Sequence, residues 1–132
     1  MRSLWQTLTV AFSSLFCFLF GDNTDMLIVL ITFMIIDYIS GVVSALINKT
    51  LNSAIGFKGI FKKLLMFLPI IIANLIDVKI ISGTPVLVSV TTVFYCVNES
   101  ISILENLAKS GVPIPKKLKT ILAQLKEKAE ND

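Results

Sequence analysis

Apolar residues occur in four long runs along the chain, and short polar connections separate them. The runs cover residues 4–20, 26–47, 60–81 and 85–107. Each is close to the roughly 20 residues that a helix needs to cross the hydrocarbon core of a bilayer. Residues 115–128 then place apolar side chains on one helical face. The pattern predicts an all-α integral membrane protein with three to four transmembrane helices and a C-terminal amphipathic helix, in a single domain over residues 1–132.

Composition supports this class of protein. The chain has 132 residues, of which 55% are hydrophobic and 16% charged, and its mean hydropathy is +0.82. Three or four spans and their connections use most of the 132 residues, so the chain has no room for a separate soluble catalytic domain. The chain has no histidine, and we find no phosphate-binding loop, no nucleophile beside a base and no paired carboxylates. The sequence therefore predicts no enzyme activity.

Neither a cofactor nor a metal is expected. Cys17 and Cys96 both lie in apolar runs, without the spacing of a metal site or of a disulfide framework. The net charge of +3 comes from lysines, most of them beside apolar runs, where they would meet anionic lipid headgroups. The bilayer is the expected partner, and nucleic acid is not.

The first run can be placed in two ways. Its polar side chains share one half of a helical wheel and its apolar side chains the other. The helix could lie in the membrane interface with Trp5 at the headgroups, or it could span with its Ser/Thr face toward protein or water. The start resembles a secretory signal, but it lacks a small-x-small cleavage pattern, so we expect it to be retained.

The ends of the third and fourth runs carry local signals. Pro69 should bend the third helix or begin its rigid part. Thr84 and Pro85 suit the N-cap and first position of the fourth helix, and Gly111 suits its C-terminal cap. Five charged residues of the two runs are expected near the interface or the headgroups: Lys62, Lys63, Asp77, Lys79 and Glu99.

Lysines are distributed unevenly between the connections. Residues 48–63 hold four lysines and no acid, and the tail is also basic, whereas Asp22 and Asp25 make the first connection acidic. The positive-inside rule places residues 48–63 and the tail in the cytoplasm, and residues 21–25 and 79–84 outside. The C-terminus is then cytoplasmic. If the first run also crosses, Arg2 lies inside as well.

The second run carries a polar stripe around a single mid-membrane carboxylate. The stripe also contains two overlapping small-xxx-small pairs, which allow close helix approach. We predict a helix–helix or oligomer interface, although a monomeric bundle could use the same stripe internally. Asp37 is expected to be protonated or hydrogen-bonded to a neighbouring helix, since no lysine of the chain is expected at its depth. The interface residues are Asp37, Ser40, Gly41, Ser44 and Ala45.

Three further groups are candidate sites. In the connection between the second and third runs, glycines allow tight turns and lysines meet phosphates, although the segment could be a flexible connector. The tail helix is expected to bind a membrane surface or a partner helix, or else to be solvated. The loop group is Ser53, Gly56, Gly59, Lys62 and Lys63; a cytoplasmic helix group is Asn98, Glu99, Glu105, Asn106, Gly111, Pro113 and Pro115; and the tail lysines are Lys116, Lys117, Lys119, Lys126 and Lys128.

Residues 26–128 resemble the toxin-secretion/phage-lysis holin family of Gram-positive phages and clostridial toxin loci. The two most specific segments are Ser53-x-x-Gly56-x-x-Gly59 followed by Lys62-Lys63, and Asn98-Glu99 through Glu105-Asn106 to Gly111-x-Pro113-x-Pro115. The resemblance implies a multi-pass protein of the bacterial cytoplasmic membrane. It also implies a homo-oligomer that forms timed lesions through which an endolysin or a large toxin leaves, as cargo that is not stably bound.

Two other functions remain open. An antiholin, or another accessory regulator, would bind a holin without forming holes. A small ion transporter would use Asp37 as its ion site, although the chain shows no internal repeat and only one deep carboxylate.

Overall fold

The computed structural model describes residues 1–131, apart from the side chains of Arg2 and Ala129, so the position predicted for Arg2 lies outside the described residues. The described part is helical, which confirms the predicted fold class. Four stretches are long and apolar enough to cross a membrane: Ser3–Phe20, Thr24–Ile47, Ser53–Ile81 and Val86–Lys109. The elements are α1 (Arg2–Phe20), α2 (Thr24–Ile47), α3 (Ser53–Leu65), α4 (Phe67–Leu75), the π-helix η1 (Ile76–Ile81), α5 (Val86–Lys109) and α6 (Lys116–Asn131).

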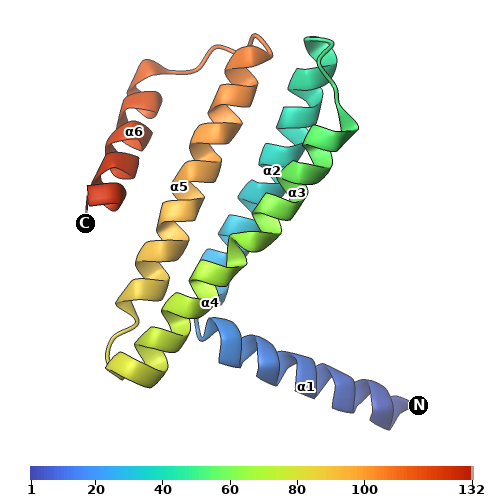
Figure 1. Cartoon of the computed structure of the whole chain (residues 1–132), viewed down its shortest axis with the longest axis vertical. Coiled ribbons are helices and arrows are strands. Elements are labelled where there is room, and N and C mark those ends of the chain that lie inside the picture. The colour runs from blue at the N-terminus through green and yellow to red at the C-terminus, as the bar shows by residue number, and fades with distance from the viewer. Residues whose placement is uncertain (132) are drawn as a thin grey trace.

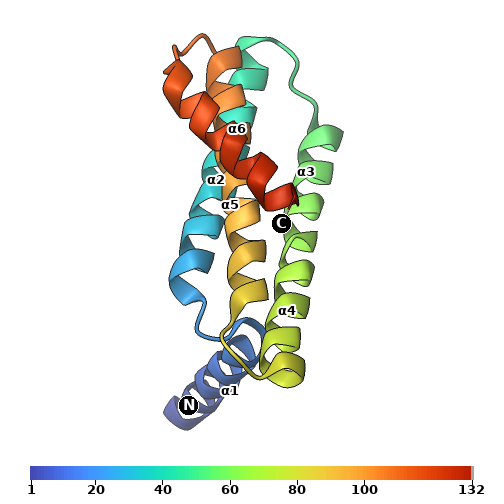
Figure 2. The ribbon, with the colours of Figure 1, turned by 90° about the vertical axis from the view of Figure 1, so that its left-hand side faces the viewer.

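Three of these four stretches run side by side as a bundle. α2 and α5 form its most extensive helix pair, and α4 packs beside α5. The short α6 turns back along one half of α5, whereas α1 leaves the opposite end of the bundle and points away from it (Figures 1 and 2). The bundle therefore has two different ends, one where the last turn of α1 joins it and one beside α6.

A polar elbow fixes α1 to the bundle. The side-chain amide of Asn74 on α4 donates to the carbonyl oxygens of Phe18 (3.1 Å) and Leu19 (2.9 Å), which lie in the last turn of α1. Gly21 follows with φ 63°, and a Cβ added there would lie 2.6 Å from Oδ1 of Asn74. Beyond the elbow α1 is exposed, with 66% of Trp5 accessible. α1 therefore lies at an angle to the bundle, and both its interfacial placement and its placement as a span stay predictions.

The third span is longer than the apolar run and is interrupted. It begins at Ser53, where Oδ1 of Asn52 accepts a hydrogen bond from the Ala54 backbone amide (2.9 Å). The connection predicted over residues 48–63 is therefore non-helical only as far as Asn52, and the rest is helix. A break at Met66 separates α3 from α4, and Pro69 falls in the first turn of α4, where its missing N–H is tolerated.

Asp77 forms the N-terminal cap of α5, contrary to the expectation of a hydrated residue at the interface. Its side chain is buried, and its two carboxylate oxygens accept hydrogen bonds from the backbone amides of Leu87 (3.2 Å) and Val88 (2.8 Å). The predicted N-cap, Thr84, is wrong, because α5 begins at Val86 and a carboxylate from η1 satisfies its free amides. A widened π-turn places that carboxylate beside the start of α5.

The other end of α5 closes as the sequence predicted. Gly111 has φ 90°, its amide donates to the Ala108 carbonyl, and the amide of Val112 donates to the Leu107 carbonyl at 3.0 Å. These are the two hydrogen bonds of a Schellman cap, in which a glycine adopts the left-handed conformation.

The apolar core lies in the half of the bundle nearer to α1. It is made by α2, α4 and α5, and aromatic side chains from α1 and α4 pack against it. Its buried members are Leu27, Leu30, Met34, Ile70, Ala73 and Val88. Toward the other half of the bundle the buried residues become polar.

Replacing Asp77 with alanine should destabilise the protein by about 1–2 kcal/mol, because the first amides of α5 would lose a buried acceptor. The measurement is thermal unfolding of the purified protein in detergent. Asp22→Ala is the matched control, since Asp22 is exposed in the neighbouring connection, and it should leave the transition unchanged. Equal effects of the two substitutions would contradict the capping role.

Candidate functional site

A cluster of one lysine and two carboxylates joins three helices inside the bundle. Nζ of Lys63 on α3 lies 2.6 Å from Oδ2 of Asp37 on α2, and it also forms an ion pair with Oε2 of Glu99 on α5. The exposed fractions of the side chains are 19% for Lys63, 11% for Asp37 and 8% for Glu99. Solvent therefore screens the attraction between these charges only weakly. The ion pairs are the main polar link between α3 and the rest of the bundle.

Asn106 holds the other oxygen of Asp37. Its side-chain amide donates to Oδ1 of Asp37 at 2.9 Å and to Oγ of Ser40 at 3.1 Å. It also lies 3.1 Å from the main-chain oxygen of Asp37. Both carboxylate oxygens of Asp37 thus have donors, which is the condition under which a buried carboxylate is tolerated.

The three charges lie at the same height because of their positions along the helices. Asp37 is ten residues before the end of α2, Glu99 is ten residues before the end of α5, and Lys63 is ten residues after the start of α3. The ends of α2 and α5 and the start of α3 lie at the same end of the bundle. At 1.5 Å per residue, each of the three charged residues lies about 15 Å from this end. The helix lengths therefore align the three side chains.

This arrangement corrects three predictions. Lys63 does lie at the depth of Asp37, although no lysine was expected there. Glu99 is buried near the middle of α5, whereas a position at the headgroups was expected. Two carboxylates share one lysine, although no paired carboxylates were expected. With both acids ionised the cluster has a net charge of −1. Its balance therefore depends on the single lysine.

The small-residue stripe of α2 is used inside the chain. Ser44 is buried, and Gly41 faces the Asn106 side chain, whose Nδ2 lies 3.4 Å from where a Cβ would be. Ala45 lines a cavity between α2, α3 and α5. In the single chain, the stripe therefore packs inside the bundle, which was the alternative to an interface between copies. A role of the stripe as an interface between copies stays a prediction.

The predicted loop group lies on α3. Ser53 begins that helix, and Gly56 and Gly59 line the same cavity as Ala45. Lys62 is exposed, whereas its neighbour Lys63 points into the bundle. The two lysines of this motif thus have different surroundings.

The predicted cytoplasmic helix group is divided between the bundle and the turn that follows it. Glu99 and Asn106 belong to the charge cluster, and Glu105 is exposed. Oδ1 of Asn98 is buried without a hydrogen-bond partner among the described residues. Gly111, Pro113 and Pro115 form the exposed connection to α6.

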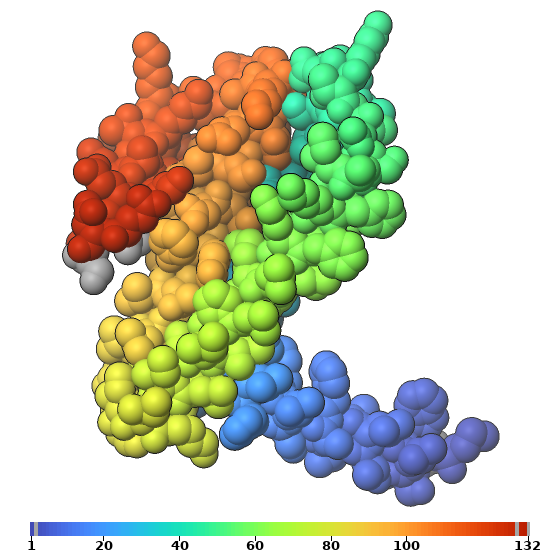
Figure 3. Space-filling view, viewed as in Figure 1, coloured from blue at the N-terminus to red at the C-terminus, as the bar shows by residue number. Residues whose placement is uncertain are grey.

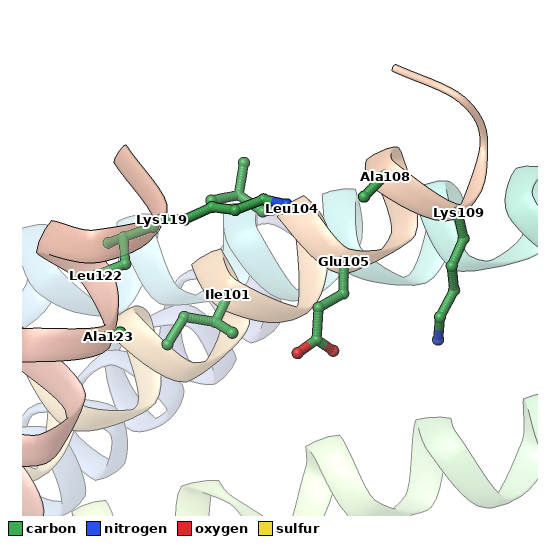
Figure 4. Close-up of a pocket in the computed structure, with 8 residues that line it drawn as sticks. All are labelled: Ile101, Leu104, Glu105, Ala108, Lys109, Lys119, Leu122 and Ala123. Atoms are coloured by element: carbon green, nitrogen blue, oxygen red, sulfur yellow. The ribbon is translucent and has the colours of Figure 1, made fainter. Parts of the chain in front are cut away.

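α6 packs against α5 through small and apolar side chains. In Figure 4, Lys119, Leu122 and Ala123 of α6 lie beside Ile101 and Leu104 of α5, around a groove of 420 Å³. Leu118 and Leu122 also line a groove with residues of α2. The tail lysines, Lys116, Lys117, Lys119, Lys126 and Lys128, are exposed or half-buried on the remaining faces.

Sequence reasoning did not find the roles of three side chains. Asp77 caps α5, Asn74 caps α1, and Asn23 donates from its side chain to Oγ1 of Thr92 at 2.8 Å. The available signal was a polar residue inside or beside an apolar run, which usually marks a helix–helix hydrogen bond in a membrane protein.

The helices and their arrangement define a multi-pass membrane protein, and comparison with known proteins refines that class. The profile of the bacteriophage holin family matches residues 14–127. A probable holin of Bacillus phage phi105 is 44% identical over 100 residues, which cover 74% of this chain and 71% of the phage protein. An uncharacterized 14.9 kDa protein of the nagH 3' region of Clostridium perfringens is 42% identical over 119 residues, or 90% of each chain. No solved structure matches the chain significantly.

The chain belongs to the bacteriophage holin family. This confirms the family resemblance drawn from the sequence.

Replacing Lys63 with methionine should cost about 3–5 kcal/mol of stability, because two buried carboxylates would remain without a counter-charge. Asp37→Asn should cost less, since it changes the net charge of the cluster from −1 to zero and retains a hydrogen-bonding side chain. Thermal unfolding in detergent measures both. Lys62→Met is the control, because Lys62 is the exposed neighbour, and it should behave as wild type. A Lys63→Met protein as stable as Lys62→Met would show that the ion pairs contribute nothing.

Proposed function

We propose that this chain is a holin that oligomerises in the bacterial cytoplasmic membrane and forms timed lesions. Through these lesions an endolysin or a large toxin would leave the cell. Membership of the holin family is the observation that carries this proposal. The charge cluster supplies polar groups inside an apolar bundle, and such groups in a membrane segment usually have a functional role.

The proposed topology has three spans, formed by α2, by α3–α4–η1 and by α5. α1 lies across the outer surface of the membrane. The basic residues of α3 and α6 support a cytoplasmic position for those ends and for the C-terminus. Asp37 and Glu99 are each thirteen residues from the start of their helix, or about 20 Å from the outer ends of α2 and α5. The cluster would then lie about two thirds of the way across a ~30 Å hydrocarbon core.

An oligomer follows from the size of the proposed cargo. Three spans cannot enclose an opening that passes a folded enzyme, so many copies must line one lesion. The stripe of Asp37, Ser40, Gly41, Ser44 and Ala45 is the proposed surface that turns toward water or toward another copy during assembly. Buried polar groups tend to be retained on such surfaces, because they specify which helices pair.

Expression of this chain alone in bacteria should stop growth abruptly after a delay and then release a co-expressed cytoplasmic enzyme. The enzyme activity in the medium and the potassium in the medium are measured together. A chain with the Asp37→Leu and Lys63→Met substitutions, at matched membrane level, is expected to release less enzyme. Release of potassium into the medium without any release of the enzyme would contradict a wide lesion. A chain that has no effect alone, but delays lysis when it is co-expressed with another holin, would be an antiholin.

The tail helix is proposed to control timing. Its lysines would each contribute roughly 1 kcal/mol near an anionic lipid surface. While α6 packs beside α5, these lysines would lie near the hydrocarbon core, which is unfavourable for charged groups. This favours a movement of α6 away from α5 and onto the membrane surface. Such a competition alters when copies assemble but does not build the opening.

Deleting residues 116–132 should therefore shift the onset of lysis while lysis still occurs. Culture density after induction gives the onset, and immunoblots of membranes confirm equal protein levels. The control replaces the tail lysines with glutamine, which keeps the helix but removes the charge attraction; it should shift the onset in the same direction. Complete loss of lysis at a normal protein level would show that the tail is part of the opening.

A further inference from the structure

A cavity of 260 Å³ lies between α2, α3 and α5, on the side of the charge cluster away from the apolar core. Asp37 and Lys63 contribute to its lining at one end, and Thr50 and Asn52 of the α2–α3 connection contribute at the other. Figure 3 shows the corresponding hollow between the upper parts of α3 and α5, with atoms of α2 at its bottom. The cavity therefore joins the charges to one end of the bundle.

α3 forms a loose wall of this cavity. All thirteen residues of α3, each of which the structure describes, are at least partly exposed. Gly56 and Gly59 line the cavity from α3, and a Cβ at Gly59 would meet nothing within 4 Å. The glycines thus leave space that an ordinary side chain would fill.

The chemistry of the lining selects the occupant. Seven of its residues carry polar side chains: Asp37, Tyr38, Thr50, Asn52, Lys63, Ser102 and Asn106. Several of these groups already bond within the protein, but a lipid acyl chain would leave their remaining donor and acceptor positions without partners. Burying a polar group without a partner costs about 1–3 kcal/mol on protein scales. Water satisfies them, and the volume holds several molecules at about 30 Å³ each.

The opposite side of the cluster is dry. Met34 lies one helical turn from Asp37 toward α1, and Leu30 and Ile70 close the bundle beyond it. The buried polar side chains on that side, Asn74, Asp77 and Thr92, all make hydrogen bonds within the protein, so they do not require water. The wet part therefore ends at the charge cluster.

We infer that this cavity is a water-filled half-channel that leads from the cytoplasmic end of the bundle to Lys63, Asp37 and Glu99. It hydrates the charges within the bilayer, which lowers the cost of keeping them ionised. Because water would already reach the charges, only the apolar outer half of the bundle would still have to open to water when a lesion forms. The direction of the half-channel rests on the proposed membrane topology, but its hydration does not.

Cysteine labelling tests the half-channel. In a chain with Cys17 and Cys96 replaced by alanine, single cysteines are introduced at Ala45 and Ser102, which line the cavity. A charged, membrane-impermeant thiol reagent is added to inverted membrane vesicles or to intact cells at expression levels below lysis. Labelling after denaturation gives the total thiol in each sample.

Both cavity cysteines should react in inverted vesicles and not in intact cells. Leu65→Cys is the control, because Leu65 is 59% exposed on the lipid side close to Lys63, and it should react at least tenfold more slowly. Adding Gly59→Leu, which fills the cavity, should slow the reaction of the cysteine at Ser102 several-fold.

Reaction of the Ser102 cysteine as slow as that of the Leu65 cysteine would overturn the half-channel. Reaction only from the outside would overturn its direction and the proposed topology together. A hydrated cavity in a chain that releases no enzyme on induction would uphold the half-channel while the proposed lesion fails, so the two failures are distinguishable.

Discussion

The ion pairs of Lys63 with Asp37 and Glu99 are the interaction on which the arrangement of α2, α3 and α5 depends. Charged groups are costly in a bilayer, so each must find its partner within the protein. One lysine from α3 serves an acid from each of the two neighbouring helices. Pulling α3 away would expose all three groups together, which makes the cluster a constraint on the position of α3.

The other end of the bundle uses polar groups differently. There Asp77 and Asn74 satisfy the free main-chain groups at the ends of α5 and α1. These groups have no intrahelical partner, and a membrane offers them little water. The caps fix the angles at which helices enter and leave the apolar core. Rigid packing at this end contrasts with the loosely covered cavity beside α3.

The two halves of the bundle therefore differ in how firmly their helices are held. The apolar core provides a sealed end, and the polar half provides groups that can contact water or another copy. A change in the position of α3 is therefore a smaller rearrangement than separating α2 from α5, the most extensive helix pair.

The sequence by itself determined the membrane class, the existence of the long apolar helices and the Gly111 cap, because hydrophobic run length and the left-handed preference of glycine are local properties. It also indicated the family. It did not determine the start of α3 at Ser53 or the π-helix η1. Only the tertiary structure decided the partners of the charges. Lys62 and Lys63 are adjacent in sequence, yet one is exposed and the other lies between two acids, since a residue's helical face has meaning only once its neighbours are placed. For the same reason Asp77, ten residues before Leu87, could not be identified as the cap of α5 until the π-turn had positioned it.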